Sequence, residues 1–232
     1  MNWLTAKIPL GKHLQIPVYL HWAVLPMLAF FFWLGIVPGL AITCAMFIVL
    51  LHEYGHAIAG RRLGSKTREI LLTPIGGVAM MEPLKKPQHD LLVALAGPAV
   101  NMALIPVLWG LSYLHSFFWL LGLYNVVMLV FNMIPALPLD GGVVLRSLLS
   151  MWWKDRYKAT LVAGRIGQGF ALLFGLIAML GGQPGLLLVA LFMLLAAEQQ
   201  IQQVKEHQTL TDNVSEGLEI LRQAQRNLNR RR

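Results

Sequence analysis

The chain contains few charged residues and almost no cysteine. Charged residues make up 13% of its 232 residues, whereas hydrophobic residues make up 56%. A soluble globular domain carries about a quarter charged residues, so this composition excludes an ordinary soluble protein. The single cysteine, Cys44, lies within an apolar run and has no second cysteine to pair with. The fold therefore does not depend on an intrachain disulfide.

A signal peptide, an internal repeat and a nucleic-acid motif are also missing. The apolar stretch after Lys7 and Lys12 is too long for a signal-peptide core and has no small-residue cleavage site, so we interpret it as the first membrane span. The net charge is +8, but the basic residues flank apolar spans and do not form a DNA-binding or RNA-binding motif. We expect no nucleic-acid partner and interpret these residues as topology signals.

Apolar segments of about 20 residues, the length that crosses a bilayer, recur along the chain. Six are present, at residues 18–37, 39–60, 91–114, 117–136, 161–180 and 184–200. The fourth has Pro135 near its end and Pro138 just after it, where it can break into a re-entrant stretch. The sequence thus predicts an all-α polytopic protein with about six transmembrane helices, surrounded by the lipid bilayer.

The basic residues lie on one side of these six spans. The connections at residues 35–39, 113–116 and 181–185 contain none of the 19 Lys and Arg residues. Because cytoplasmic loops collect Lys and Arg, we expect both termini in the cytoplasm. Basic cytoplasmic loops in a small chain without a signal peptide indicate a prokaryotic plasma (inner) membrane.

Two segments outside the spans have patterns of their own. Between the second and third spans, short β-capable runs at residues 68–73 and 77–81 flank a Pro-Ile-Gly turn, which predicts a small membrane-associated hairpin or sheet. After the last span the chain becomes polar, with four apolar residues at helical spacing: Val214, Leu218, Leu221 and Leu228. We therefore divide the chain into a transmembrane domain, residues 1–200 with a core at about 39–142, and a cytoplasmic tail, residues 201–232, that forms an amphipathic helix.

The second span ends in an H-E-x-x-H sequence formed by His52, Glu53 and His56. On a helix, residues four apart share one face, so both imidazoles can turn toward one ion. Glu53 lies beside that face, where it can take a proton from water instead of binding the ion. Ionisable side chains inside a membrane span are costly and mark functional sites. The motif predicts a Zn²⁺ site with Glu53 as the catalytic base.

A catalytic zinc site needs a third protein ligand and an open fourth position. The best candidate is Asp140, which follows the fourth span. Arg61 marks the cytoplasmic end of the second span, so His56 and His52 lie roughly 8 and 14 Å inside that boundary, at 1.5 Å per helical residue. The fourth span runs toward the same side and places Asp140 shortly before Arg146. The histidine pair and Asp140 are therefore predicted to lie at a similar depth in the membrane.

Together these elements resemble the site-2 protease family of zinc intramembrane proteases. The similarity is carried by H-E-x-x-H, by G-G-V-A at residues 76–79, by A-G-P-A-V-N at residues 96–101 and by N-M-I-P-A-L-P-L-D-G at residues 132–141. It implies a three-helix core with one zinc ion that cleaves the transmembrane segments of membrane-anchored, single-span substrates. A regulatory membrane protein is a further partner to expect. No PDZ or cystathionine-synthase-type domain is visible, so the chain resembles a minimal version of the family.

The resemblance also implies individual roles. The zinc ligands would be His52, His56 and Asp140, with Glu53 activating water. Asn132 resembles the asparagine that faces the reacting carbonyl and would donate to the oxyanion. The strand Gly76, Gly77, Val78 and Ala79 resembles the element that pairs with an unwound substrate. Asn101 is left between a polar clamp on the Asp140 loop and a substrate contact.

Other classes of function remain open at this point. A divalent-metal transporter would also place His, Glu and Asp within spans, but it needs ligands at more than one depth and usually a repeat relating two halves. An inactive relative serving as a membrane scaffold would lack Glu53 or a ligand, and none is missing. Gly97 and Pro98 have a simpler explanation as packing and kink residues.

Overall fold

The computed structural model describes residues 6–230, which form seven helices and four strands. In chain order these are β1 (Lys7–His13), β2 (Ile16–His21), α1 (Val24–Leu34), α2 (Ile36–Arg62), β3 (Thr67–Thr73), β4 (Gly76–Met81), α3 (Pro87–Ser112), α4 (Ser116–Asn132), α5 (Asp140–Trp153), α6 (Arg156–Gly181) and α7 (Pro184–Arg230).

The helices confirm the predicted membrane fold with one change in their number. α2, α3, α6 and α7 contain apolar stretches long enough to cross a membrane, and α1 and α4 are shorter apolar helices. The predicted fourth span corresponds to α4, which ends at Asn132, and a separate helix, α5, begins at Asp140. Between them lie Pro135 and Pro138, which have no backbone N–H to continue a helix. This break accounts for the seventh helix.

The predicted hairpin after α2 is present as β3 and β4, paired antiparallel. Its turn reaches Gly76, whose φ of +143° is open to glycine and strained for other residues. The sheet is larger than predicted, because the N-terminal residues form a second hairpin. Its strand order is β1-β2-β3-β4, and β2 pairs parallel to β3.

The prediction of a membrane span starting at residue 18 is wrong for its first residues. Strand β2 occupies Ile16–His21, and the helix that follows, α1, has 11 residues. Every second residue of β2 is buried, and Ile16 and Val18 pack against Ala57 of α2 and Ile70 of β3. Such alternation is the period of a strand with one buried face. The apolar composition of this segment therefore comes from packing in the sheet.

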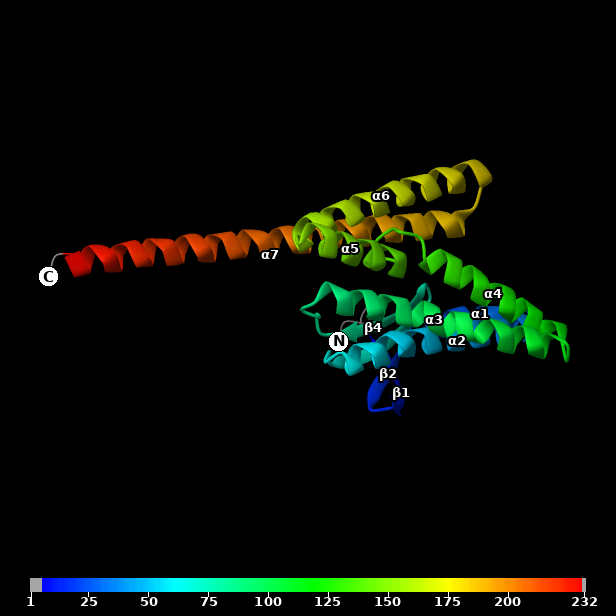
Figure 1. The fold of residues 1–232 in the computed structure, drawn as a ribbon. Coiled ribbons are helices and arrows are strands. Elements are labelled where there is room, and N and C mark those ends of the chain that lie inside the picture. Colours follow the sequence, from blue (N-terminus) through cyan, green and yellow to red (C-terminus); the bar gives the residue numbers. More distant parts are fainter. Residues whose placement is uncertain (1–5, 231–232) are drawn as a thin grey trace.

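The helix ends form two groups (Figure 1). The α3–α4 and α6–α7 connections lie at one end, on the right of the view, and the end of α2, the start of α3 and the α5–α6 turn lie at the other. α7 is a single helix of 47 residues that extends well beyond its neighbours. No change of secondary structure marks residue 200, so the proposed division into domain and tail remains a prediction.

Candidate metal centre

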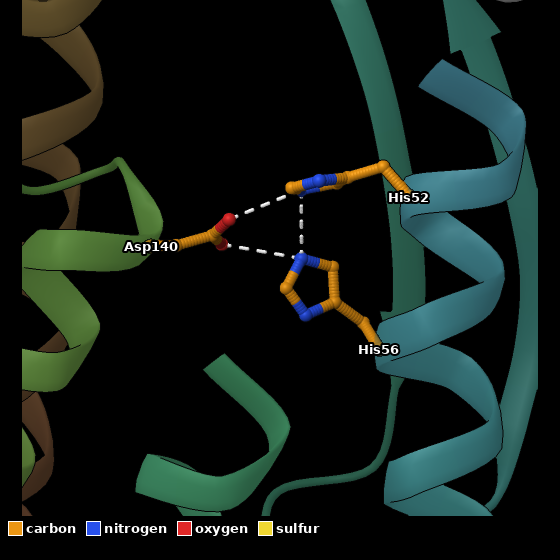
Figure 2. A group of neighbouring side chains, drawn as sticks. All are labelled: His52, His56 and Asp140. Carbon is orange, nitrogen blue, oxygen red and sulfur yellow. Dashed lines mark hydrogen bonds and ion pairs between the residues drawn. The ribbon is translucent and has the colours of Figure 1, made fainter. Parts of the chain in front are cut away.

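The three predicted zinc ligands meet at one point although they are distant in sequence. His52 and His56 are one turn apart on α2, and Asp140 is the first residue of α5. His52 Nε2 lies 3.0 Å from Asp140 Oδ2, and His56 Nε2 lies 3.3 Å from Asp140 Oδ1. One ligand atom from each residue lies within 4.8 Å of the others. Figure 2 shows the two imidazoles and the carboxylate turned toward one another.

The outer nitrogens of both imidazoles face oxygen acceptors. His52 Nδ1 bonds the side-chain oxygen of Asn101, and His56 Nδ1 lies 2.7 Å from the backbone carbonyl oxygen of Val93. An oxygen acceptor fixes the proton of a neutral imidazole on Nδ1, which leaves the lone pair of Nε2 free. Both Nε2 atoms point inward and are 3.0 Å apart. The rings are therefore oriented to bind a cation between them.

The residues present fit a zinc ion. His52 and His56 are 3% and 7% exposed, which excludes a solvated surface cluster. Asp140 Oδ2 is buried and accepts no hydrogen bond in the part of the chain that the structure describes. A buried acceptor without a partner costs free energy, and three converging lone pairs repel one another unless a cation lies between them. Two imidazole nitrogens and one carboxylate are a donor set typical of catalytic zinc.

Gly97 of α3 forms one wall of this site. A Cβ atom at Gly97 would lie 2.6 Å from His56 Cε1 and 2.7 Å from His52 Cε1, closer than real Cβ contacts come. On the facing helix, a Cβ atom at Gly55 would lie 2.6 Å from the carbonyl oxygen of Ala96. Gly97 is therefore a packing residue, and the groups that it packs against are the two imidazoles of the predicted zinc site.

The loop before Asp140 folds back onto the helix that it precedes. Ala136 and Leu137 are fully buried in this loop. A Cβ atom at Gly142 would lie 2.7 Å from the carbonyl oxygen of Ala136, and one at Gly167 of α6 would lie 3.3 Å from the carbonyl carbon of Leu137. These glycines let the loop pack closely on α5 and α6. The loop thereby sets the position of the Asp140 carboxylate.

A cluster of three charges anchors the rest of α5. The carboxylate of Asp90, in the first turn of α3, lies 2.7 Å from Arg156 Nη2 and 3.7 Å from Arg146 Nη2. Arg156 also donates to the carbonyl oxygen of Leu84 at 3.0 Å. The cluster joins the start of α3 to α5 and α6.

The catalytic base predicted from the sequence contacts the sheet. Glu53 is 8% exposed, and its Oε2 accepts a hydrogen bond of 2.8 Å from the backbone N–H of Ala79. A Cβ atom at Gly77 would lie 2.6 Å from Glu53 Cγ. β4 is the last strand in the sheet order, so this bond is made from its outer edge. Gly77 and Ala79 therefore lie against Glu53, whereas Gly76 is the first residue of β4, next to the turn, and the side chain of Val78 is 48% exposed; the pairing of this strand with a substrate remains a prediction.

Asn101 lies between side chains of two neighbouring helices. Its side chain is fully buried and bonds His52 on one side and Asn125 of α4 on the other. It lies one helical turn after Gly97, on the face of α3 that packs against α2, and the roles predicted for it at the substrate or the Asp140 loop remain predictions. Asn132 is the partly exposed last residue of α4, and its role as oxyanion donor remains a prediction.

Two polar groups around the site, the Asn125 side chain and the Val93 carbonyl, were not predicted from the sequence. Asn125 is a fully buried amide within the apolar segment at residues 117–136, and a buried polar side chain in a span is itself a signal of function. The carbonyl of Val93 carries no signal at all, because every residue has one.

Comparisons with known proteins agree with this geometry. A zinc metalloprotease of Methanocaldococcus jannaschii is 35% identical over 220 residues, which cover 90% of this chain and 64% of that relative. Stage IV sporulation protein FB of Bacillus subtilis is 34% identical over 152 residues, covering 61% of this chain and 51% of that relative. The chain thus spans about half to two thirds of the length of these relatives.

A solved structure, the site-2 protease from Methanocaldococcus jannaschii, superimposes with a TM-score of 0.68 at 34% identity, covering 84% of this chain and 95% of that one. The model of peptidase family M50 matches residues 40–116 and 109–176, a region that contains the histidine pair of α2 and the carboxylate of α5. With more than half of its length matched and its predicted ligand residues brought together, the chain belongs to peptidase family M50.

Proposed function

We propose that this chain is an intramembrane zinc metalloprotease that hydrolyses peptide bonds in or near the transmembrane segments of membrane-anchored proteins. The observation that carries the proposal is the convergence of three ligand atoms within 4.8 Å beside Glu53 on an apolar helix. The names of the relatives, a zinc metalloprotease and a site-2 protease, support the same activity.

Each residue of the site has its own role in hydrolysis. Zinc bound by His52, His56 and Asp140 would supply a Lewis acid and lower the pKa of water to about 7. Glu53 takes the proton from the attacking water and returns it to the leaving nitrogen. The Ala79 N–H fixes the direction of the Glu53 carboxylate. Asn132 would donate a hydrogen bond to the oxygen of the scissile carbonyl as charge develops on it.

The substrate has to be unwound before it can be cut. A helical substrate uses each carbonyl in its own hydrogen bonds, and an edge strand can replace these bonds by pairing with the extended segment. β4 is such an edge strand and lies directly against Glu53. Because the Ala79 N–H is already bonded to Glu53, the substrate pairs with the remaining edge groups or displaces the carboxylate. Helix-breaking residues near the cut site should therefore help cleavage.

The proposed topology has six crossings, with α4 and α5 together forming the fourth, and both termini in the cytoplasm of a prokaryote. Arg61 and Arg62 end α2 next to the metal centre, while the α1–α2, α3–α4 and α6–α7 connections contain no Lys or Arg. The positive-inside rule places the metal centre nearer the cytoplasmic face. A regulatory membrane protein that controls substrate access is part of this proposal.

The transporter alternative has no observation in its favour. A transporter needs metal ligands at several depths along a path. Among residues 6–230, one group of His, Cys, Asp and Glu side chains has the geometry to hold a metal ion, and it is the group described above.

The test is co-expression of the chain with candidate single-span membrane substrates, followed by detection of the cleaved fragment. Glu53→Gln keeps the size of the side chain and removes the base, so we expect the fragment to disappear. Glu82→Gln, the same change outside the site, is the matched control and should cleave like the wild type. Equal processing by the wild type and Glu53→Gln would overturn the proposed chemistry.

A further inference from the structure

We propose that Asn125 is a positioning residue for the metal ligand His52 and that it acts through Asn101. The inference rests on one part of the proposed function, namely that His52 binds the metal. The three residues come from three helices, His52 from α2, Asn101 from α3 and Asn125 from α4. Both asparagine side chains are fully buried, so water cannot take over their hydrogen bonds.

The two asparagines form a closed pair. Asn101 Nδ2 donates to Asn125 Oδ1 at 2.7 Å, and Asn125 Nδ2 donates to the backbone carbonyl oxygen of Asn101 at 2.9 Å. Asn101 Oδ1 then faces His52 Nδ1. A chain of hydrogen bonds thus runs from the backbone of α3 through Asn125 and back through Asn101 to the imidazole.

The direction of every bond in this chain follows from the backbone carbonyl. A carbonyl oxygen only accepts, so the group of Asn125 that faces it is the NH₂ group. Asn125 therefore presents its oxygen to Asn101, and Asn101 has to present its own NH₂ group in return. This leaves Asn101 Oδ1 for His52. Reversing either amide places two oxygens or two donors against each other in a buried site, which costs free energy.

This direction determines which nitrogen of His52 can bind a metal. With an oxygen opposite Nδ1, the ring carries its proton there, and Nε2 keeps the lone pair that faces Asp140. Without Asn125, the amide of Asn101 is free to turn its NH₂ group toward Nδ1. That arrangement favours the tautomer with its proton on Nε2, which cannot bind the ion. Met128 Sδ, 3.7 Å from Asn101 Nδ2, is too weak an acceptor to hold the amide.

Packing alone does not account for this pair. Two buried amides are expensive among apolar helices, and a leucine fills a similar volume without needing partners. One turn earlier on α4, Leu121 packs against Leu108 of α3 in that purely apolar way. The same helix pair thus contains an apolar contact and an amide contact, and only the amide contact reaches the metal ligand.

The test measures the zinc affinity of the purified full-length protein by competition with a chelator of known affinity, independently of activity. We expect Asn125→Ala to weaken zinc binding by about 10- to 100-fold, the loss typical when the partner of a metal-binding histidine is removed. If Asn125 acts through Asn101, its removal has no further effect once Asn101 is gone. The double variant Asn101→Ala, Asn125→Ala should then have the same zinc affinity as the single variant Asn101→Ala.

Leu121→Ala is the matched control, because it removes packing between the same two helices. It should lower the melting temperature and leave zinc affinity unchanged. Should Asn125→Ala fail to fold, Asn125→Leu replaces it, since leucine fills a similar volume and neither donates nor accepts a hydrogen bond. We expect the same direction of change.

Wild-type zinc affinity in the Asn125 variant, or additive losses in the double variant, would overturn the inference. Failure of the proposed function would give a different pattern of zinc affinities. In that case the wild-type protein and His52→Ala would bind zinc equally poorly, whereas failure of the inference alone leaves the wild type binding zinc and cleaving its substrate.

Discussion

The backbone N–H of Ala79 donates a hydrogen bond of 2.8 Å to the carboxylate of Glu53. The edge strand of the sheet is therefore directly bonded to the proposed catalytic base, although α2 and β4 are separate elements of the chain. Pairing of a substrate with β4 would take place at the group that aims the base. Because of this contact and the close packing around the two histidines, single substitutions should have defined effects on cleavage and on zinc binding.

Gly77→Ala should reduce cleavage without reducing metal content. Its Cβ atom would lie 2.6 Å from Glu53 Cγ, so the carboxylate has to move. A displacement of about 1 Å in a catalytic group costs on the order of 100-fold in rate. The measurements are the cleavage rate and the zinc content of the purified protein. Val78→Ala, which shortens a half-exposed side chain on the same strand, is the control. Wild-type cleavage by Gly77→Ala would show that the base does not need this space.

Gly97→Ala should abolish zinc binding and activity together. The added methyl group would lie within 2.7 Å of ring atoms of both His52 and His56, and neither imidazole can withdraw without losing its Nδ1 partner. Zinc content by elemental analysis is the readout. Gly110→Ala on the same helix is the matched control, because its Cβ would meet open space. It should be neutral or stabilising by up to about 1 kcal/mol. Full zinc content in Gly97→Ala would contradict the described geometry.

Asp90→Asn should loosen α5 and weaken zinc binding through Asp140. The substitution leaves Arg146 and Arg156 close together without their carboxylate, and Arg146 is largely buried. We expect a lower melting temperature and a measurable fall in zinc affinity. Asp212→Asn, at an exposed position of α7, should change neither quantity. A stable Asp90→Asn protein with unchanged zinc affinity would mean that the loop and its glycines hold Asp140 by themselves.

Removal of the metal should destabilise the protein. A ligand that binds the folded state alone stabilises it by about 2.7 kcal/mol when its concentration is 100 times its dissociation constant. Without zinc, Asp140 Oδ2 is a buried acceptor with no hydrogen bond in the described part of the chain. Chelation should therefore lower the melting temperature, and added zinc should restore it. Asp140→Asn, which replaces the third ligand, should show little response to zinc, and an equal response would exclude Asp140 as a ligand.

Much of the site could be predicted from local patterns. The spacing of His52 and His56 places two imidazoles on one helical face whatever the rest of the fold is. Asp140 could be paired with them because the basic residues at the span ends put both segments at one depth. The break between α4 and α5 followed from Pro135 and Pro138, which remove backbone donors wherever they occur.

Other features were hidden because they depend on packing between distant segments. The apolar residues of β2 have the composition of a membrane span, and only their burial against Ala57 and Ile70 distinguishes a strand from a helix. Gly97 looked like an ordinary packing residue until the identity of its neighbours was known. The partners of Asn101, His52 and Asn125, could not be predicted because sequence spacing does not say which helix lies opposite.

The amino-acid sequence by itself determined the chemistry of this protein, namely a membrane chain with two histidines, a glutamate and an aspartate able to hold zinc and activate water. Tertiary structure alone decided how that chemistry is oriented. The tautomer of His52, the direction of the Glu53 carboxylate and the position of Asp140 each depend on a hydrogen bond or a close contact with another element. Side-chain composition and helical period are local properties, whereas hydrogen-bond direction and atomic clearance exist only once the helices are packed.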